Sequence, residues 1–263
     1  MTATPAEVKA CCGNAYAGSA ARWLLGERFH PGGARLTSRL ADALCVGPSG
    51  LVVDVASGPG TSTLQVARET GSEVIGVDLS PASVDSARRA ATRSGLADRA
   101  RFVLGDAESL PLDDAIADGA ICECALCTFP DKRAAAAEIA RVLKPGARFA
   151  LSDMVAEPER LPAELRTLEA WVSCFADARP LEEVAGLLAD VGLEPELLER
   201  HDGALAGMLD RVEARLRAAR LLGAGAPAAL VQNVDRGLAL AAAARESVSD
   251  GALGYGVVVA RRA

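Results

Sequence analysis

Short apolar runs alternate with longer amphipathic stretches from about residue 50 onward. Apolar runs of this length, bounded by turn signals, are typical of buried strands, and the stretches between them have helical composition. The alternation predicts an α/β fold, in which helices cover both faces of a doubly wound, mostly parallel sheet. Strands are expected at Gly50–Ala56, Glu73–Asp78, Ala100–Gly105, Gly119–Cys124, Arg148–Asp153 and Gly254–Ala260, and helices at Ser62–Thr70, Pro81–Ser94 and Asp131–Leu143.

The pattern is different at both ends of the chain. Residues 5–45 are helical in composition, and the turn His30-Pro-Gly-Gly33 interrupts them. Residues 157–192 predict two helices, the second starting at Pro180, and residues 203–249 predict further helices, broken near Gly223–Pro227. A valine-rich run at the end of the chain should then return to the sheet, so the helices at 203–249 form an insertion before the last strand.

Composition excludes several classes of function. The 263 residues carry a formal net charge of −7, so we expect binding neither to nucleic acid nor to an anionic membrane, which both select basic faces. No apolar run approaches the roughly 20 residues of a membrane span, and the start of the chain lacks the pattern of a secretion signal. Seven cysteines without such a signal indicate a reducing, cytoplasmic location, with thiols kept free.

The segment Leu51-Val-Val-Asp-Val-Ala-Ser-Gly-Pro-Gly60 is the strongest functional signal. An apolar run that ends in a glycine turn is typical of a buried strand that leads into a helix. Asp78 ends the next run, where a carboxylate can accept both ribose hydroxyls, and Asp106 follows the third, where it can accept from the adenine amine. A dinucleotide fingerprint would place a third small residue at position 63, which is a threonine. The pattern therefore predicts a site for an adenosine-containing cofactor.

These motifs resemble those of the class I S-adenosylmethionine-dependent methyltransferases. The resemblance covers about residues 48–153 and includes Gly76-Val-Asp-Leu-Ser80, Gly105-Asp-Ala-Glu108 and Arg141-Val-Leu-Lys-Pro-Gly146. It implies S-adenosylmethionine as cofactor and a seven-stranded Rossmann-like sheet. The implied division is a helical cap (1–47), a cofactor-binding methyltransferase domain (48–202 and 250–263) and a helical insertion over the active site (203–249).

The same resemblance implies the residues that bind the cofactor. The glycine turn is expected to contact the methionine part, the end of the second strand the ribose, and the segment after the third strand the adenine. Cys122 is expected either to contact the cofactor through its backbone or, like Cys45, to be a small core residue. The full set is Ala56, Ser57, Gly58, Gly60, Asp78, Leu79, Asp106, Ala107 and Cys122.

Two cysteines further resemble those of the arsenite methyltransferases. In that family one cysteine lies shortly before a Pro-Asp-Lys sequence and another lies on the helix after the fifth strand, and Cys124 and Cys174 fall on those positions. The resemblance implies that both are catalytic and bind trivalent arsenic. A further cysteine that the family often carries after the glycine turn is absent here. A third sulfur would come from Cys11, Cys12 or Cys127, or from glutathione.

The chemistry agrees with this interpretation. Trivalent arsenic is thiophilic, so sulfur is preferred over imidazole or carboxylate as its ligand. Arsenic keeps a lone pair once sulfur binds it, so a methyl group can be accepted without a base that removes a proton. Placement then provides most of the rate enhancement, of the order of 7–11 kcal/mol for well-aligned reactants.

Two alternatives remain open at the level of sequence. The chain could methylate an organic small molecule, with the cysteines as apolar lining and residues 203–249 as a lid. It could also bind a metalloid or the cofactor without transferring a methyl group. The sequence does not indicate an oligomeric state.

Overall fold

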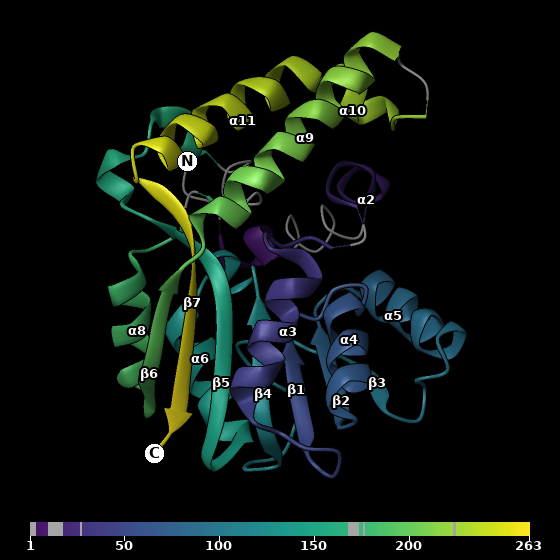
Figure 1. The fold of residues 1–263 in the computed structure, drawn as a ribbon, viewed down its shortest axis with the longest axis vertical. Helices are drawn as coiled ribbons and strands as arrows, with labels where there is room; N and C mark the ends of the chain where they lie inside the picture. The colour runs from purple at the N-terminus through teal and green to yellow at the C-terminus, as the bar shows by residue number, and fades with distance from the viewer. Residues whose placement is uncertain (1–3, 10–17, 27, 168–173, 176, 223–224) are drawn as a thin grey trace.

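The computed structural model describes residues 4–9, 18–26, 28–167, 174–175, 177–222 and 225–263. Its centre is a seven-stranded sheet with the strand order β3-β2-β1-β4-β5-β7-β6 (Figure 1). β1 to β5 run parallel, and β7 runs antiparallel to its two neighbours, which confirms the mostly parallel α/β fold. The strands are β1 (Leu51–Val55), β2 (Glu73–Asp78), β3 (Ala100–Leu104), β4 (Ala117–Glu123), β5 (Leu143–Ala156), β6 (Leu193–Arg200) and β7 (Leu253–Arg262).

β6 is the strand that the sequence pattern missed. Its sequence, Leu-Glu-Pro-Glu-Leu-Leu-Glu-Arg, alternates between more and less buried positions instead of forming an apolar run. It lies at the edge of the sheet, where a proline is tolerated, and the pairing with β7 shifts register between Pro195 and Leu197. β5 also starts earlier than expected, directly after the preceding helix.

Helices cover both faces of the sheet, as expected (Figure 1). α3 (Gly33–Leu44), α4 (Thr61–Thr70) and α5 (Pro81–Arg93) pack against one face, and α6 (Lys132–Val142) and α8 (Leu181–Ala189) against the other. In α3 the buried leucines recur at helical spacing, at 36, 40 and 44. Burying each such side chain contributes about 1.5–3 kcal/mol.

The described part of residues 157–175 contains two 3-10 turns, Pro158–Arg160 and Ala163–Arg166, and the first of the two helices expected at 157–192 stays a prediction. Residues 168–173 lie outside the described residues. The second helix is α8, which follows Pro180 as expected.

The helical insertion before the last strand is present. It consists of α9 (Asp202–Leu222), α10 (Ala228–Gln232) and α11 (Val234–Ser249), and α9 and α11 lie side by side (Figure 1). They lie beyond the edge at which the parallel strands end. α9 also holds α2 (Ser19–Leu25), because Arg215 Nη1 donates to Leu24 O at 2.8 Å. Among the described residues, no helix has the length and apolar character of a membrane span.

The register of the sheet aligns the ends of the parallel strands. Val55 pairs with Val77 on one side and with Cys122 on the other. The segments that follow β1, β2 and β4 therefore start side by side at one edge, which is where ligands bind in open α/β sheets.

Candidate active site

The turn after β1 contains three residues with left-handed backbone conformation, Ala56 (φ 60°), Gly58 (φ 54°) and Gly60 (φ 84°). A side chain on Gly60 would place its Cβ 2.6 Å from Cζ of Phe102, so packing requires glycine there. A Cβ on Gly58 would meet nothing within 4 Å. The two glycines therefore serve different purposes: one allows α4 to approach the sheet, and the other leaves open space above the turn.

That open space belongs to a cavity of about 1150 Å³, its open mouth included, at the carboxyl edge of the sheet. Gly60, Cys122 and Cys174 do not line this cavity. The other residues predicted from the sequence do line it: Ala56, Ser57, Gly58, Asp78, Leu79, Asp106, Ala107 and Cys124.

Asp78 is held in place by two backbone amides. Gly58 N donates to Asp78 Oδ2 at 2.8 Å, and Ser80 N donates to Oδ1 at 2.9 Å. Burial raises the pKa of this carboxyl group above its ordinary value, although both amides oppose the shift. Each carboxylate oxygen has two lone pairs, so both can accept a further hydrogen bond, as the ribose interpretation requires.

Asp106 has a partner that the sequence did not indicate. Lys9, from the helical residues 5–9, donates from Nζ to Asp106 Oδ2 at 2.7 Å and to Glu108 Oε2 at 2.6 Å. Lys9 also lines the cavity, so the N-terminal part of the chain reaches the end of the cavity at which we expect the adenine to bind. The partners are 97 and 99 positions apart, which leaves no local sequence signal.

The open space, the unpartnered polar atom and the carboxyl groups of the cavity fit S-adenosylmethionine. A Cβ on Gly58 would project into open space that a ligand can occupy, and Ser57 Oγ is a buried lining atom without a hydrogen-bond partner. Asp54 and Glu123 add carboxyl groups to the lining. Burial, with the charges of Glu123 and Asp78, raises the pKa of Asp54 to about 8. A cationic ligand would favour ionisation of this group.

Three thiols come together beside the cavity, near the segment that follows β4, and Cys124 lines the cavity itself. Cys174 lies beside both Cys124 and Cys127, and its Sγ is 3.6 Å from the carbonyl oxygen of Cys124. The hydrogen bond to Cys174 and burial raise the pKa of the Cys124 thiol. Burial and then the same Cys174 contact raise the pKa of the Cys127 thiol. Both groups are therefore neutral thiols at neutral pH.

An ion pair between Lys132 and Asp177 holds the Cys174 segment in this position. Lys132 also donates to Phe129 O at 3.0 Å, and Arg179 donates to the other oxygen of Asp177 at 3.0 Å. The side chains of Lys132 and Asp177 are only 13% and 16% exposed. The pair thus ties the start of α6 to the segment that carries the remote thiol.

Asp153 contacts the backbone of the segment that carries the thiols. Its Oδ2 accepts from Cys127 N at 2.8 Å, and its Oδ1 accepts from Met154 N at 2.7 Å. Burial, followed by the proximity of Cys174, raises the pKa of Asp153 to about 7. Among the described residues, no group of three or more His, Cys, Asp or Glu side chains has the arrangement of a metal site.

The remaining cysteines lie elsewhere or are not described. Cys122 is fully buried in the sheet core, and burial raises the pKa of its thiol well above the ordinary value. Cys45 is exposed at the end of α3, and Arg148 Nη1 lies 2.9 Å from its Sγ. Cys11 and Cys12 lie outside the described residues.

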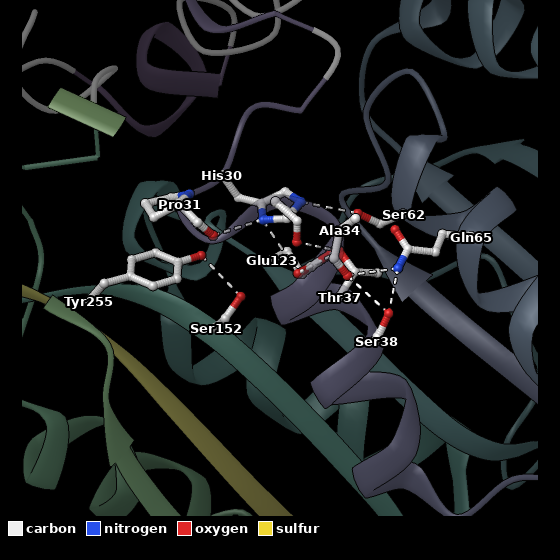
Figure 2. Close-up of polar contacts among 11 residues, drawn as sticks. His30, Pro31, Ala34, Thr37, Ser38, Ser62, Gln65, Glu123, Ser152 and Tyr255 are labelled. Atoms are coloured by element: carbon white, nitrogen blue, oxygen red, sulfur yellow. Dashed lines mark hydrogen bonds and ion pairs between the residues drawn. The ribbon is translucent and has the colours of Figure 1, made fainter. Parts of the chain in front are cut away.

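A buried histidine and a buried glutamate, neither of them among the predicted site residues, also line the cavity. Figure 2 shows His30 and Glu123 pointing toward each other, with Nδ1 of His30 3.5 Å from Oε1 of Glu123. Thr37 Oγ1 donates to Glu123 Oε2 at 3.1 Å, and Ser62 Oγ lies 3.4 Å from His30 Nε2. In the sequence, His30 belongs to a turn that indicates a helix break. The sequence feature that could have pointed to Glu123 is its position between two cysteines, in Cys122-Glu-Cys124.

Comparisons with known proteins agree with this geometry. Residues 53–151 match the family model described as a methyltransferase domain. The chain is 32% identical to the 27-O-demethylrifamycin SV methyltransferase of Amycolatopsis mediterranei over 63% of this chain and 61% of that protein. It is 30% identical to the arsenite methyltransferase of Halobacterium salinarum over 56% of this chain and 38% of that protein. The chain spans less than two thirds of the length of the first curated relatives it matches.

Among solved structures, the fold is similar to that of geranyl diphosphate C-methyltransferase from Streptomyces coelicolor A3(2). The two chains cover each other completely, with a TM-score of 0.76 and 20% identity. This likeness extends the shared fold to the helices outside the matched domain. Residues 53–151 of this chain thus match a methyltransferase domain, and the chain as a whole shares the fold of a solved methyltransferase.

Proposed function

We propose that the protein transfers a methyl group from S-adenosylmethionine to trivalent arsenic held by the thiols of Cys124 and Cys174. The observation that carries this proposal is the contact of the Cys174 thiol with Cys124 and Cys127 beside the cofactor cavity. When bound, the cofactor supplies a methyl group on a positively charged sulfur. The 30% identical arsenite methyltransferase supports the same acceptor.

The protonation state of the thiols favours a metalloid over a divalent metal ion. A divalent ion needs thiolates, and the raised pKa values of Cys124 and Cys127 oppose their formation. Arsenous acid instead condenses with neutral thiols, because each As–OH and S–H pair gives one As–S bond and one water molecule. No charge is buried in that exchange, so this apolar site suits it.

Two thiols of the chain are required, and a third sulfur completes the arsenic ligands. Cys127 is adjacent to Cys174, and it provides the third sulfur if its side chain turns toward the thiols of Cys124 and Cys174. Glutathione provides it otherwise, and the absence of a three-residue metal arrangement among the described residues favours this second route. The arsenic atom keeps its lone pair, so no residue has to remove a proton from it.

We further propose that the helical cap (1–47) and the insertion (203–249) cover the acceptor and exclude water. Lys9 and His30 from the cap line the cavity, and Asp202 at the start of α9 accepts from Tyr255 N at 3.0 Å. We place the reaction in the cytoplasm, because the proposed chemistry needs reduced thiols at Cys124 and Cys174 and a reducing compartment maintains them.

The proposal is tested by incubating the protein with arsenite, glutathione and S-adenosylmethionine and identifying methylated arsenic by liquid chromatography with elemental mass detection. We expect Cys124→Ser and Cys174→Ser to lose product formation and arsenite binding while they still bind the cofactor. Cys45→Ser is the matched control, because Cys45 is exposed and outside the cavity. No product from the wild-type protein, with arsenite binding unchanged in both variants, would reject the proposal.

A second acceptor, an organic hydroxyl compound, is favoured by the His30–Glu123 pair (Figure 2). If Nδ1 carries the proton that faces Glu123 and Pro31 O, Nε2, which Ser62 Oγ contacts at 3.4 Å, can take a proton from a hydroxyl group that replaces this contact. The rifamycin methyltransferase acts on such an acceptor by its name. Turnover of a phenol or alcohol that falls in His30→Gln and Glu123→Gln but not in Cys174→Ser would select this function.

A further inference from the structure

Arg28 presents an unsatisfied donor to the cofactor cavity. Its side chain lines the cavity, and its Nη1 atom is buried without a hydrogen-bond partner. Its Cδ lies 3.5 Å from the Cβ position of Gly33, so the side chain runs past the start of α3. A buried guanidinium nitrogen without an acceptor is costly, because it has given up water for no hydrogen bond.

The neighbouring charges indicate which ligand would satisfy Arg28. Lys9, the lysine of the cavity lining, is engaged by Asp106 and Glu108. Glu123 is engaged by Thr37, and Asp78 by two backbone amides. In the described lining, several carboxyl groups therefore already accept hydrogen bonds, whereas the Arg28 guanidinium keeps one N–H donor without an acceptor. A ligand that combines cationic groups with one oxyanion would complement it.

We propose that Arg28 binds a carboxylate in this cavity and that the carboxylate is the amino-acid end of the cofactor. Guanidinium groups pair with carboxylates through two parallel hydrogen bonds, and Nη1 is available for one of them. The glycine turn and Arg28 line the same cavity, so a single ligand can reach both. A carboxylate on the acceptor has the same chemistry, and the experiment separates the two sources. The inference concerns cofactor binding and does not depend on arsenic as acceptor.

The test compares two ligands that differ by one group. S-adenosylmethionine carries the carboxylate, and its decarboxylated form lacks it but keeps the amine and the sulfonium. Dissociation constants are measured by calorimetry on the full chain without acceptor, for the wild-type protein, Arg28→Met, Arg28→Lys and the control Arg35→Met. Arg35 is exposed on α3 and carries the same charge outside the cavity lining.

We expect Arg28→Met to weaken S-adenosylmethionine at least about tenfold, as expected for a hydrogen bond to a charged group, and the decarboxylated form by less than about twofold. Arg28→Lys should recover part of the loss, and Arg35→Met should match the wild-type protein. The ligand-free melting temperature of Arg28→Met should not fall, since the variant removes an unpaired buried donor.

Two results would overturn the proposal. Equal losses for both ligands, with a lower melting temperature, would mean that Arg28 only supports the structure. Unchanged affinity for both ligands would mean that the carboxylate of the cofactor does not reach Arg28, and it would assign this donor to the acceptor instead.

Discussion

The two ends of the cavity are built in different ways. The cofactor end consists mainly of backbone turns that directly follow β1, β2 and β3, as when Gly58 N donates to Asp78, and Lys9 is added from the N-terminal part of the chain. The end at which we propose that the acceptor binds is assembled from side chains far apart in the chain, including Cys124 with Cys174 and His30 with Glu123. We infer that the cofactor end depends on backbone shape, whereas the acceptor end depends on contacts that hold remote segments together.

The glycine turn offers the largest test of this contrast. In Gly60→Ala the new Cβ would collide with Phe102 and Ala87 in a left-handed residue, so we expect a loss of about 2–4 kcal/mol in the free energy of unfolding. Urea denaturation measures this loss.

Gly58→Ala is the matched comparison, because its Cβ would enter open space. We expect at most about 1–2 kcal/mol of destabilisation from the left-handed backbone, with the main effect on cofactor affinity. Similar stability losses in the two variants would contradict the different purposes assigned to these glycines.

The ion pair between Lys132 and Asp177 tests the acceptor end. Asp177→Asn should weaken arsenite binding by on the order of tenfold, because about 1–2 kcal/mol of support for the Cys174 segment is lost. Cofactor affinity should change by less than about twofold, since neither residue lines the cavity.

Asp190→Asn is the control for that variant, because its ion pair with Arg133 is more than half exposed. Calorimetry with arsenite and with S-adenosylmethionine measures both affinities. A loss of cofactor binding in Asp177→Asn equal to the loss of arsenite binding would mean that the two ends are not independent.

The pH dependence of cofactor binding sharpens the picture of the cofactor end. Asp54, with a pKa raised to about 8 in the ligand-free protein, is mostly protonated at pH 7. A cationic ligand favours the ionised form, so affinity should rise with pH, by up to about tenfold per unit, and level off above about pH 8. Asp54→Asn should flatten this rise. Affinity that falls between pH 6 and 8 would contradict the assignment.

Cys45→Ser should have the smallest effect. Cys45 is exposed at the end of α3, so we expect a change within about 0.5 kcal/mol in stability and none in arsenite or cofactor affinity. A clear loss of arsenite binding would show that this thiol, and not the Cys124–Cys174 pair alone, holds the metalloid.

The sequence predicted features formed by residues close together in the chain and missed contacts between residues far apart in it. The glycine turn, Asp78 and Asp106 were identified because each directly follows an apolar run. Gly60 and Cys122 were placed in the same set, yet neither lines the cavity, because one packs on Phe102 and the other faces the core. β6 was missed because an edge strand needs no continuous apolar run.

The acceptor end shows the limit more clearly. Cys124 and Cys174 were paired only through a family resemblance, since 50 residues separate them and neither flank predicts the other. Glu123 and Thr37 are 86 positions apart, and the same limit applies at the cofactor end, where Lys9 is 97 positions from Asp106. Such contacts arise only when the chain folds and brings strand ends and remote segments together. The hydrophobic periodicity along the chain therefore does not predict them.

The most direct test of the central claim is X-ray absorption spectroscopy at the arsenic edge, on the protein loaded with arsenite and glutathione. We expect arsenic surrounded by sulfur alone in the wild-type protein and in Cys45→Ser, with oxygen replacing sulfur in Cys174→Ser. Arsenic that keeps an oxygen environment in the wild-type protein, or that is unaffected by the loss of Cys174, would contradict the account.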